Sequence, residues 1–413
     1  MKMDSVIVFG DSLSDIGKKW VTKSGRLARA TNQMYVSPTG RFSDCRNWTD
    51  FMIEEATGLS MIFDSAQKTV DFSKNFTSLS KSSRFVGPNS FYYANYAEGG
   101  ACGHTPASKG PFLGTFKDQV DAFAKDCEAT NERLGNMLFI IWFGANDLYT
   151  AGCTATQMAT VAQEVATVQR NRLATLAQRF GTAAVFIFVN LARPLTSVRY
   201  TMRLKKVEAK LRELADPNVI EMKDLSGRFQ GSMEKADSAL EYDLYVNQGK
   251  KRSAAYEQLA KQVNEIKELE KGVVIYNRKL AELAAAQNDF VTEIDTCLSE
   301  EAISQLVASN SRLVWGASSS TATHVSSSSY EQATASSSTT TIDEVHPTDQ
   351  VYKLIWLEIR KEITKAGCTF GGGASGAASS SSPTQPQGGA SSSVPTQSPA
   401  TTPADIELVA LGI

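Results

Sequence analysis

The residue best placed for covalent chemistry is Ser12, which follows the apolar run at residues 6–9 and the dipeptide Gly10-Asp11. Four β-branched or aromatic residues before a glycine predict a buried parallel strand that ends in a tight turn. Open α/β sheets place their chemistry at the carboxyl ends of such strands, where a nucleophile is useful. Ser12 could equally be only the N-cap of the next helix. By itself the serine leaves both interpretations open.

A serine hydroxyl becomes a good nucleophile when a base takes its proton and a third group orients that base. The chain has three histidines, and Asp343-x-x-His346 offers a base and an acid on one short loop. His104 is the competing base, but no acid is placed near it in the same way. His324 lies in a Ser/Thr-rich tract whose composition predicts mobility. The spacing therefore favours His346 as the base and Asp343 as its orienting group.

Acyl transfer also needs donors for the oxyanion, and losing one donor costs roughly 3–4 kcal/mol of barrier. The Ser12 amide is one candidate, and the Gly100 amide in a glycine-rich loop is a second. The side chain of Asn146, which follows the apolar run at residues 137–143, is a third. Each of them could be only a turn residue. Because all three follow expected strands, we expect them to meet at one edge of the sheet.

The alternation of strands and helices predicts the fold class. Strands are expected at residues 6–10, 91–97, 137–143, 183–191 and 273–276. Helices are expected at residues 47–57, 154–180, 278–286 and 349–366. Strand–helix–strand units at this spacing predict right-handed crossovers. We therefore expect an α/β protein, a three-layer α/β/α sandwich with a parallel sheet of about five strands.

The 413 residues are expected to form one domain over 1–370, followed by a tail. A charged segment at about 197–272 is expected to be a helical insertion. The Ser/Thr-rich loop 316–341 and the Gly/Ser/Thr/Pro-rich tail 371–413 cannot bury a core. These two segments are therefore expected to be disordered.

Composition excludes several classes of function. A net charge of -2 gives no support to nucleic-acid binding. The longest apolar runs are too short to cross a bilayer. Six cysteines without a CxxC pair, and three histidines without ligand spacing, predict neither a metal site nor a redox site. Disulfides are permitted but not required. Residues 1–5 leave no room for a secretory signal, so the chain starts in a cytoplasm or has lost a leader.

Four blocks in order resemble the GDSL, or SGNH-hydrolase, family. They are FGDSLSD at 9–15, NYAEGGA at 95–101, GAND at 144–147 and DEVHPT at 343–348. The resemblance implies a flavodoxin-like SGNH-hydrolase domain that acts without a metal or a cofactor. It implies Ser12 as nucleophile, His346 and Asp343 as the rest of a triad, and Gly100 and Asn146 as oxyanion donors beside the Ser12 amide.

Within this family, the chain is most similar to bacterial glycerophospholipid–cholesterol acyltransferases and related secreted or injected phospholipases. The likeness rests on GRFSD at 40–44 with Trp48, on WFGAND at 142–147 and on HPT at 346–348. It implies an acyl-enzyme formed from membrane glycerophospholipids, with a sterol as a candidate acyl acceptor. It also implies peripheral membrane contact and secretion or translocation into a host cell. The aromatic residues Trp142, Phe143 and Tyr149 could line an acceptor pocket.

Two alternatives remain. A carbohydrate or small-ester acetylesterase is one, because the fold serves many acyl esters. A non-catalytic, stalked surface-binding module is the other, and the Ser-rich tail is its only support.

Overall fold

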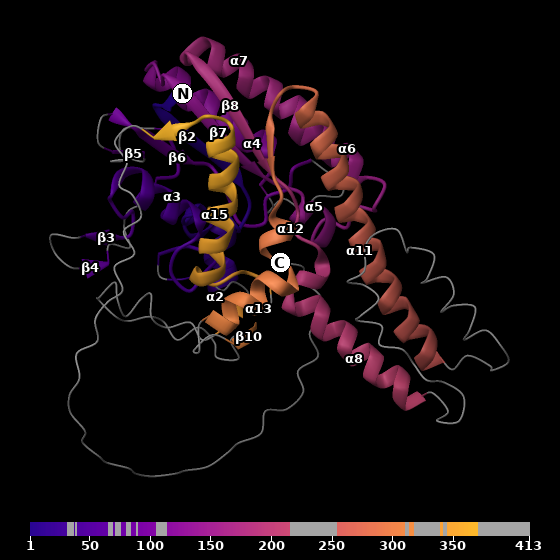
Figure 1. Ribbon diagram of the computed structural model, residues 1–413. Helices are drawn as coiled ribbons and strands as arrows, with labels where there is room; N and C mark the ends of the chain where they lie inside the picture. Colours follow the sequence, from indigo (N-terminus) through magenta and orange to yellow (C-terminus); the bar gives the residue numbers. More distant parts are fainter. Residues whose placement is uncertain are drawn as a thin grey trace, which may run out of the picture.

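A six-stranded sheet forms the centre of the computed structural model, in the order β5-β6-β2-β7-β8-β9 (Figure 1). The structure describes residues 1–30, 37, 39–64, 69–70, 76–79, 84–87, 90–104, 114–214, 254–309, 314–317, 339–341 and 345–370. The strands are β5 Phe85–Val86, β6 Tyr92–Asn95, β2 Ser5–Gly10, β7 Asn136–Trp142, β8 Ala183–Val189 and β9 Phe290–Thr292. Only β5 is antiparallel within this sheet. Among the parallel strands, β2 comes first in the sequence and lies between β6 and β7, the second and the third. This is the flavodoxin-like order.

Helices cover both faces of this sheet, which confirms the predicted α/β fold. One layer contains α4 Phe116–Thr130, α6 Met158–Gln163, the π-helical turn Glu164–Gln169, α7 Arg170–Phe180 and α11 Ala254–Ala285. The other contains α3 Trp48–Thr57, α12 Ile294–Cys297, α13 Glu300–Ser309 and α15 Asp349–Lys365. Strand β2 contributes to both cores, because Ile7 and Phe9 face the first layer while Val6 and Val8 face the second.

Five further helical elements in the described part of the chain connect these layers or extend from them. They are α1 Lys18–Val21, α2 Lys23–Ala30, α5 Ala145–Tyr149, the 3-10 turn Pro194–Thr196 and α8 Val198–Leu214. Three small strand pairs complete the fold: β1 Lys2–Met3 with β12 Thr369–Phe370, β3 Phe63–Asp64 with β4 Thr69–Val70, and β10 Val314–Ala317 with β11 Thr339–Thr341. None of the described helices is long and apolar enough to cross a membrane.

The strand predicted at residues 273–276 is wrong, because these residues lie inside the long helix α11. Val273, Tyr276 and Leu280 follow one another at helical spacing and are fully buried in the first core. Gly272 does not end the helix: a Cβ there would meet Leu148 Cδ1 at 2.7 Å, so the glycine permits close packing on α5. The fifth parallel strand is instead β9.

The expected insertion is a pair of helices, α8 and α11, that project together from the domain (Figure 1). They pack through a small separate core of Leu204 and Val207 against Leu259, Val263 and Ile266. Residues 215–253 between them lie outside the described part of the chain. The loop expected to be disordered at 316–341 has ordered ends, because β10 and β11 pair in parallel. Its interior, 318–338, and the tail 371–413 lie outside the described residues.

Candidate active site

Ser12 lies in the turn that follows β2, at the carboxyl edge of the sheet. Gln119 of α4 fixes the end of this strand: its Nε2 donates to the Gly10 carbonyl at 2.8 Å, and its Oε1 accepts from the Gly10 amide at 3.1 Å. A Cβ at Gly10 would lie 3.0 Å from both Ser14 Oγ and the Trp142 carbonyl, so the turn is as tight as the sequence predicted. The neighbouring Ser14 is buried, and its Oγ accepts from the indole of Trp48 at 3.1 Å.

His346 lies far from Ser12 in the sequence, but its side chain contacts Ser12 in the fold. Its Nε2 lies 2.8 Å from Ser12 Oγ. The residue comes just before α15, where an antiparallel bridge joins Pro347 to Thr341 of β11. The ring of Phe42 packs against the imidazole, with centroids 5.0 Å apart. Asp343, the predicted orienting acid, lies outside the described residues.

The loops after β6 and β7 bring Gly100 and Asn146 to the same place. Asn146 lies in the first turn of α5. Its Nδ2 donates to Asp11 Oδ2 at 3.2 Å and to the Ala101 carbonyl at 3.1 Å. Gly100 has a φ of +81°, in the left-handed region that suits glycine. Within the described part of the chain, the N–H groups of Ser12 and Gly100 donate to no other protein group. Both are therefore available to a bound oxygen.

Two buried carboxyl groups, Asp11 and Asp147, lie behind this site, and burial shifts both toward the neutral acid. Burial raises the pKa of Asp11 to about 7, although the Leu13 N–H and the nearby His346 oppose the shift. Burial also raises the pKa of Asp147 to about 6, against the N–H groups of His104 and Gly103. These two amides donate to the Asp147 carboxyl at 2.9 and 2.7 Å. His104, the competing base, thus contributes a backbone N–H to the Asp147 carboxyl.

Asp15 connects the serine turn to the glycine loop, a role that the sequence analysis did not assign. Its Oδ2 accepts from the Gly99 amide at 2.7 Å and from the Lys19 amide at 3.0 Å. The pKa of Asp15 is raised by burial to about 6. This contact fixes Gly100 relative to Ser12. The presence of the acid within the FGDSLSD block was the available signal.

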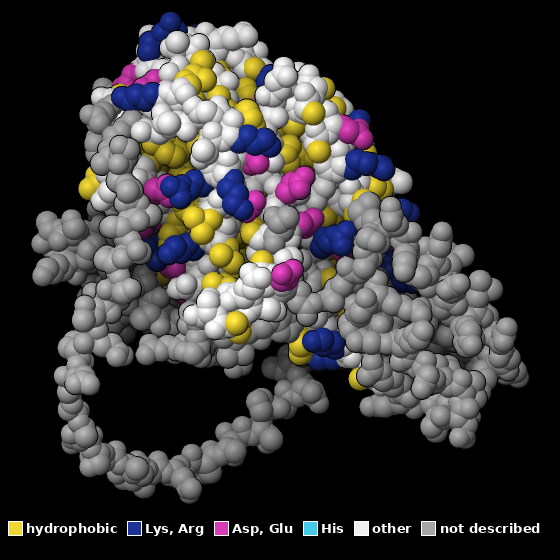
Figure 2. Space-filling model, viewed as in Figure 1, with side chains coloured by type: hydrophobic (Ala, Val, Ile, Leu, Met, Phe, Trp, Pro, Cys, Tyr) yellow, Lys and Arg dark blue, Asp and Glu magenta, His cyan; other side chains and the backbone are white. Residues whose placement is uncertain are grey.

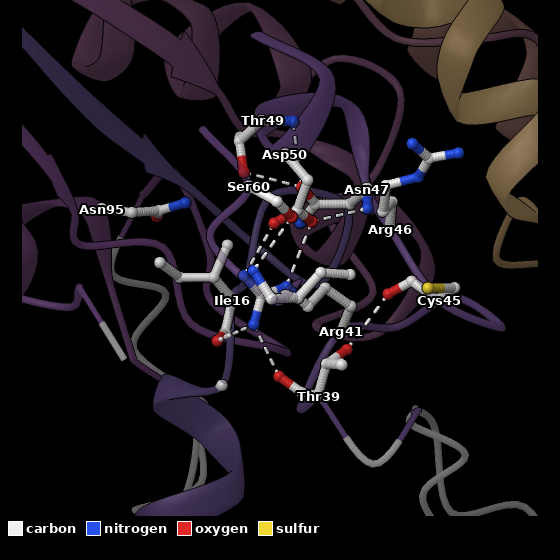
Figure 3. A network of polar contacts seen from close by, with 12 residues as sticks. Ile16, Thr39, Arg41, Cys45, Arg46, Asn47, Thr49, Asp50, Ser60 and Asn95 are labelled. Carbon is white, nitrogen blue, oxygen red and sulfur yellow. Dashed lines mark hydrogen bonds and ion pairs between the residues drawn. The ribbon is translucent and has the colours of Figure 1, made fainter. Parts of the chain in front are cut away.

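A buried ion pair between Arg41 and Asp50 fixes the loop that carries Phe42, and this role was also missed. Figure 3 shows the hydrogen bonds around Arg41 and Asp50. Arg41 Nη2 lies 2.7 Å from Asp50 Oδ1, and its Nε donates to Asp50 Oδ2 at 3.1 Å. The third guanidinium nitrogen, Nη1, donates to the carbonyls of Ile16 and Thr39 at 3.0 and 2.7 Å. The loop that carries Phe42 to His346 is therefore fixed to α3 and to the serine turn.

An apolar cavity of about 250 Å³ opens beside Ser12, Gly100, Asn146 and His346, which all line it. Much of its wall is hydrophobic, and includes Leu13, Trp142, Leu191, Ile294, Val351 and Ile355. Of the three aromatic residues expected at a pocket, Trp142 and Tyr149 line the cavity. Phe143 does not, because it stacks on Phe116 in the core at 4.6 Å.

The described residues contain no cluster of His, Cys, Asp and Glu that could hold a metal ion. All six cysteines are free thiols. Burial raises the pKa of Cys297 to about 12, and it moves the pKa values of Cys45 and Cys127 in the same direction. These thiols are therefore protonated at neutral pH.

A serine–histidine pair beside two amide donors and an asparagine, at the carboxyl edge of a flavodoxin-like sheet, is the arrangement of a serine ester hydrolase. The sequence pattern of the GDSL-like lipase/acylhydrolase family matches residues 6–359, so the chain belongs to this family of ester hydrolases. A search of curated protein sequences finds no match.

Two solved structures are similar to the chain at low sequence identity. One is phospholipase A1 from Streptomyces albidoflavus, with 8% identity over 87% of this chain and 99% of that chain, and a TM-score of 0.31. Another is an extracellular lipase from Streptomyces rimosus, with 11% identity over 71% of this chain and 82% of that chain, and a TM-score of 0.28.

Proposed function

We propose that this chain hydrolyses acyl esters of membrane glycerophospholipids through an acyl-enzyme on Ser12. The observation that carries the proposal is the 2.8 Å contact between Ser12 Oγ and His346 Nε2 at the wall of an apolar cavity. A hydroxyl hydrogen-bonded to an imidazole can lose its proton as it attacks. Transfer of an acyl chain from water into an apolar cavity is favourable.

In the proposed reaction, Ser12 Oγ bonds to the ester carbonyl carbon while its proton passes to His346 Nε2. The bond to the alcohol then breaks, and the alcohol leaves with that proton. A water molecule next gives a proton to His346 and attacks the acyl-enzyme. The fatty acid leaves, and Ser12 recovers its proton. We assign Asp343 the role of orienting His346.

The oxyanion of each tetrahedral intermediate would accept hydrogen bonds from the Ser12 and Gly100 amides and from Asn146 Nδ2. The two amides have no protein acceptor among the described residues, which supports this role. Asn146 Nδ2 has two hydrogen atoms, and its present acceptors are Asp11 and Ala101. It would exchange the 3.2 Å bond to Asp11 for the oxyanion.

The same proposal includes transfer of the acyl group to a sterol and action outside the producing cell. Trp142 and Tyr149 at the cavity wall are candidates to contact an apolar acceptor. An oriented acceptor competes well with water, because orientation gives it a high effective concentration. An acetylesterase would have little use for so much apolar wall, which favours the lipid substrate.

The test is lipid analysis of phosphatidylcholine vesicles, with and without cholesterol, after incubation with the wild type and with Ser12→Ala. We expect free fatty acid from the wild type, cholesteryl ester when cholesterol is present, and neither product from Ser12→Ala. Release of acetate from acetyl esters without any fatty acid would favour the acetylesterase. Products that persist in Ser12→Ala would overturn the assignment of the nucleophile.

A fluorophosphonate probe tests the nucleophile independently of the substrate. It should modify Ser12 and not Ser14, which is buried and hydrogen-bonded to Trp48. A folded wild type that takes up no probe would support the non-catalytic binding module instead.

A further inference from the structure

The helix α8 carries a basic stripe along its exposed face. Residues 198–210 contain five basic residues and one acidic residue, Glu208. Arg199, Met202, Lys206 and Lys210 follow at intervals of three or four residues, so they share one side of the helix. All four are exposed, and Met202 retains 41% of its accessible surface. We call these four residues the α8 stripe.

The opposite side of α8 is committed to α11. Leu204 and Val207 are buried against Leu259, Val263 and Ile266. The Arg203 guanidinium reaches the carboxylate of Glu265 on α11 at 2.5 Å. The α8 stripe therefore faces away from the partner helix. Near the start of α8 as Figure 1 draws it, Figure 2 shows dark blue basic side chains close to yellow hydrophobic ones.

The helix that carries this stripe also forms a wall of the cavity. Ser197, Val198, Arg199 and Tyr200 line the cavity beside Ser12. Tyr200 also packs against the catalytic edge of the domain, because its ring lies 5.5 Å from that of Tyr149 in α5. Whatever surface the α8 stripe binds is therefore held next to the cavity that Ser12 lines.

We propose that the α8 stripe docks this protein on an anionic phospholipid surface and so presents the bilayer to the cavity. Basic side chains are attracted to anionic headgroups, and an exposed methionine among them can enter the headgroup boundary. An acidic protein would also attract the lysines, but it would have no use for a site beside the cavity that Ser12 lines. The inference rests on the proposed lipid substrate.

The experiment measures binding of full-length protein to vesicles in the Ser12→Ala background, which avoids hydrolysis. Ser12→Ala protein should co-sediment with vesicles of phosphatidylcholine and phosphatidylserine, and much less with phosphatidylcholine alone. Adding Lys206→Glu and Lys210→Glu should weaken the partition coefficient about 30-fold, which corresponds to about 1 kcal/mol for each residue. Raised salt should likewise weaken vesicle binding by the Ser12→Ala protein with an unchanged α8 stripe.

The matched control changes two other exposed lysines, Lys125 of α4 and Lys353 of α15, to glutamate. This control makes the same change in net charge and should bind vesicles as tightly as its parent. With Ser12 restored, all variants should hydrolyse a soluble short-chain ester equally well, because Lys206 and Lys210 do not line the cavity.

Equal losses in the stripe variant and in the control would overturn the proposal, as would equal binding to neutral and anionic vesicles. Absence of vesicle binding would also overturn it and would favour a protein partner. A wild type that binds anionic vesicles but hydrolyses no ester would refute the proposed function alone, so the two failures are distinguishable.

Discussion

His346 and His104 differ in which of their atoms reach the site. The imidazole of His346 contacts Ser12 Oγ at 2.8 Å, whereas His104 contributes its backbone N–H to Asp147 at 2.9 Å. His346→Ala should therefore lower kcat for a short-chain ester by roughly four to six orders of magnitude. His104→Ala keeps its backbone donor and should retain most of the activity. The reverse ranking would contradict the proposed base.

Asp11 makes the stability of the fold depend on pH. Its pKa is raised by burial from 3.8 to about 7, so the folded state binds a proton that the unfolded state has already released. The resulting stabilisation is complete below about pH 4 and is lost as the pH rises through about 7. Asp15, Asp44 and Asp147, whose pKa values are raised to about 6, act in the same direction.

Wild-type protein should therefore lose free energy of unfolding between about pH 5 and about pH 8. Asp11→Asn cannot ionise, so its loss over this interval should be smaller by about 2–3 kcal/mol. Urea unfolding at the two pH values measures the difference, and the comparison within each variant cancels the cost of the substitution itself. An identical loss in both proteins would show that Asp11 is not the titrating group.

At the scale of elements, the pair Arg41–Asp50 fixes the loop between the serine turn and α3. Both side chains are buried, at 1% and 0% exposure, so removing one charge leaves the other without compensation. Arg41→Met should cost about 3–5 kcal/mol of unfolding free energy in urea. The double variant Arg41→Met/Asp50→Asn should lose less than the sum of the single losses. Strict additivity would show that the two groups are not coupled.

The close contact between α11 and α5 predicts an unusual sign for a helix substitution. Gly to Ala in a helix interior normally stabilises by about 1 kcal/mol. At Gly272 the added Cβ would meet Leu148 Cδ1 at 2.7 Å, so we expect Gly272→Ala to destabilise by about 1–3 kcal/mol. Urea unfolding measures the change. Lys261→Ala, at an exposed position of the same helix, should be nearly neutral.

The elements that the sequence predicted well are those with local signals. Apolar runs located β2, β7 and β8, and the helix expected at 47–57 is α3, which Asn47 caps and Gly58 ends. Helix α4 was not anticipated, although Thr115 and Asp118 form its capping box. The β-branched run inside α11 was misassigned, because periodicity over four residues cannot separate a strand from a buried helix.

The predictable part of the site is equally local. Ser12, Gly100 and Asn146 each follow a parallel strand, and topology alone brings such residues together. The support from Phe42 and Asp15 depends on packing between segments distant in sequence, which no local pattern records. Asp343 stays a prediction.

At the scale of the whole molecule, the cavity is a product of the complete chain. Its wall combines the ends of β2 and β7 with α5, α8, α12, α13 and α15, so residues from 11 to 355 contribute to one apolar space. No single unit of the fold contains this space. Under the proposed function, this assembled cavity would select among acyl chains, and a substitution in its wall would change that selection without altering Ser12 or His346.

Ala192 lines this cavity on the segment that follows β8. Among the lining residues of that segment it has the smallest apolar side chain, so a larger apolar residue can replace it. Ala192→Phe should narrow the space available to a long acyl chain while leaving room for an acetyl group beside Ser12. We expect kcat/KM for a long-chain ester to fall at least about tenfold, the equivalent of about 1.4 kcal/mol of lost transition-state binding. The same variant should hydrolyse an acetyl ester of the same alcohol at close to the wild-type rate. Equal losses on the two esters would mean that the acyl chain does not occupy this cavity, and they would remove the main structural support for a lipid substrate.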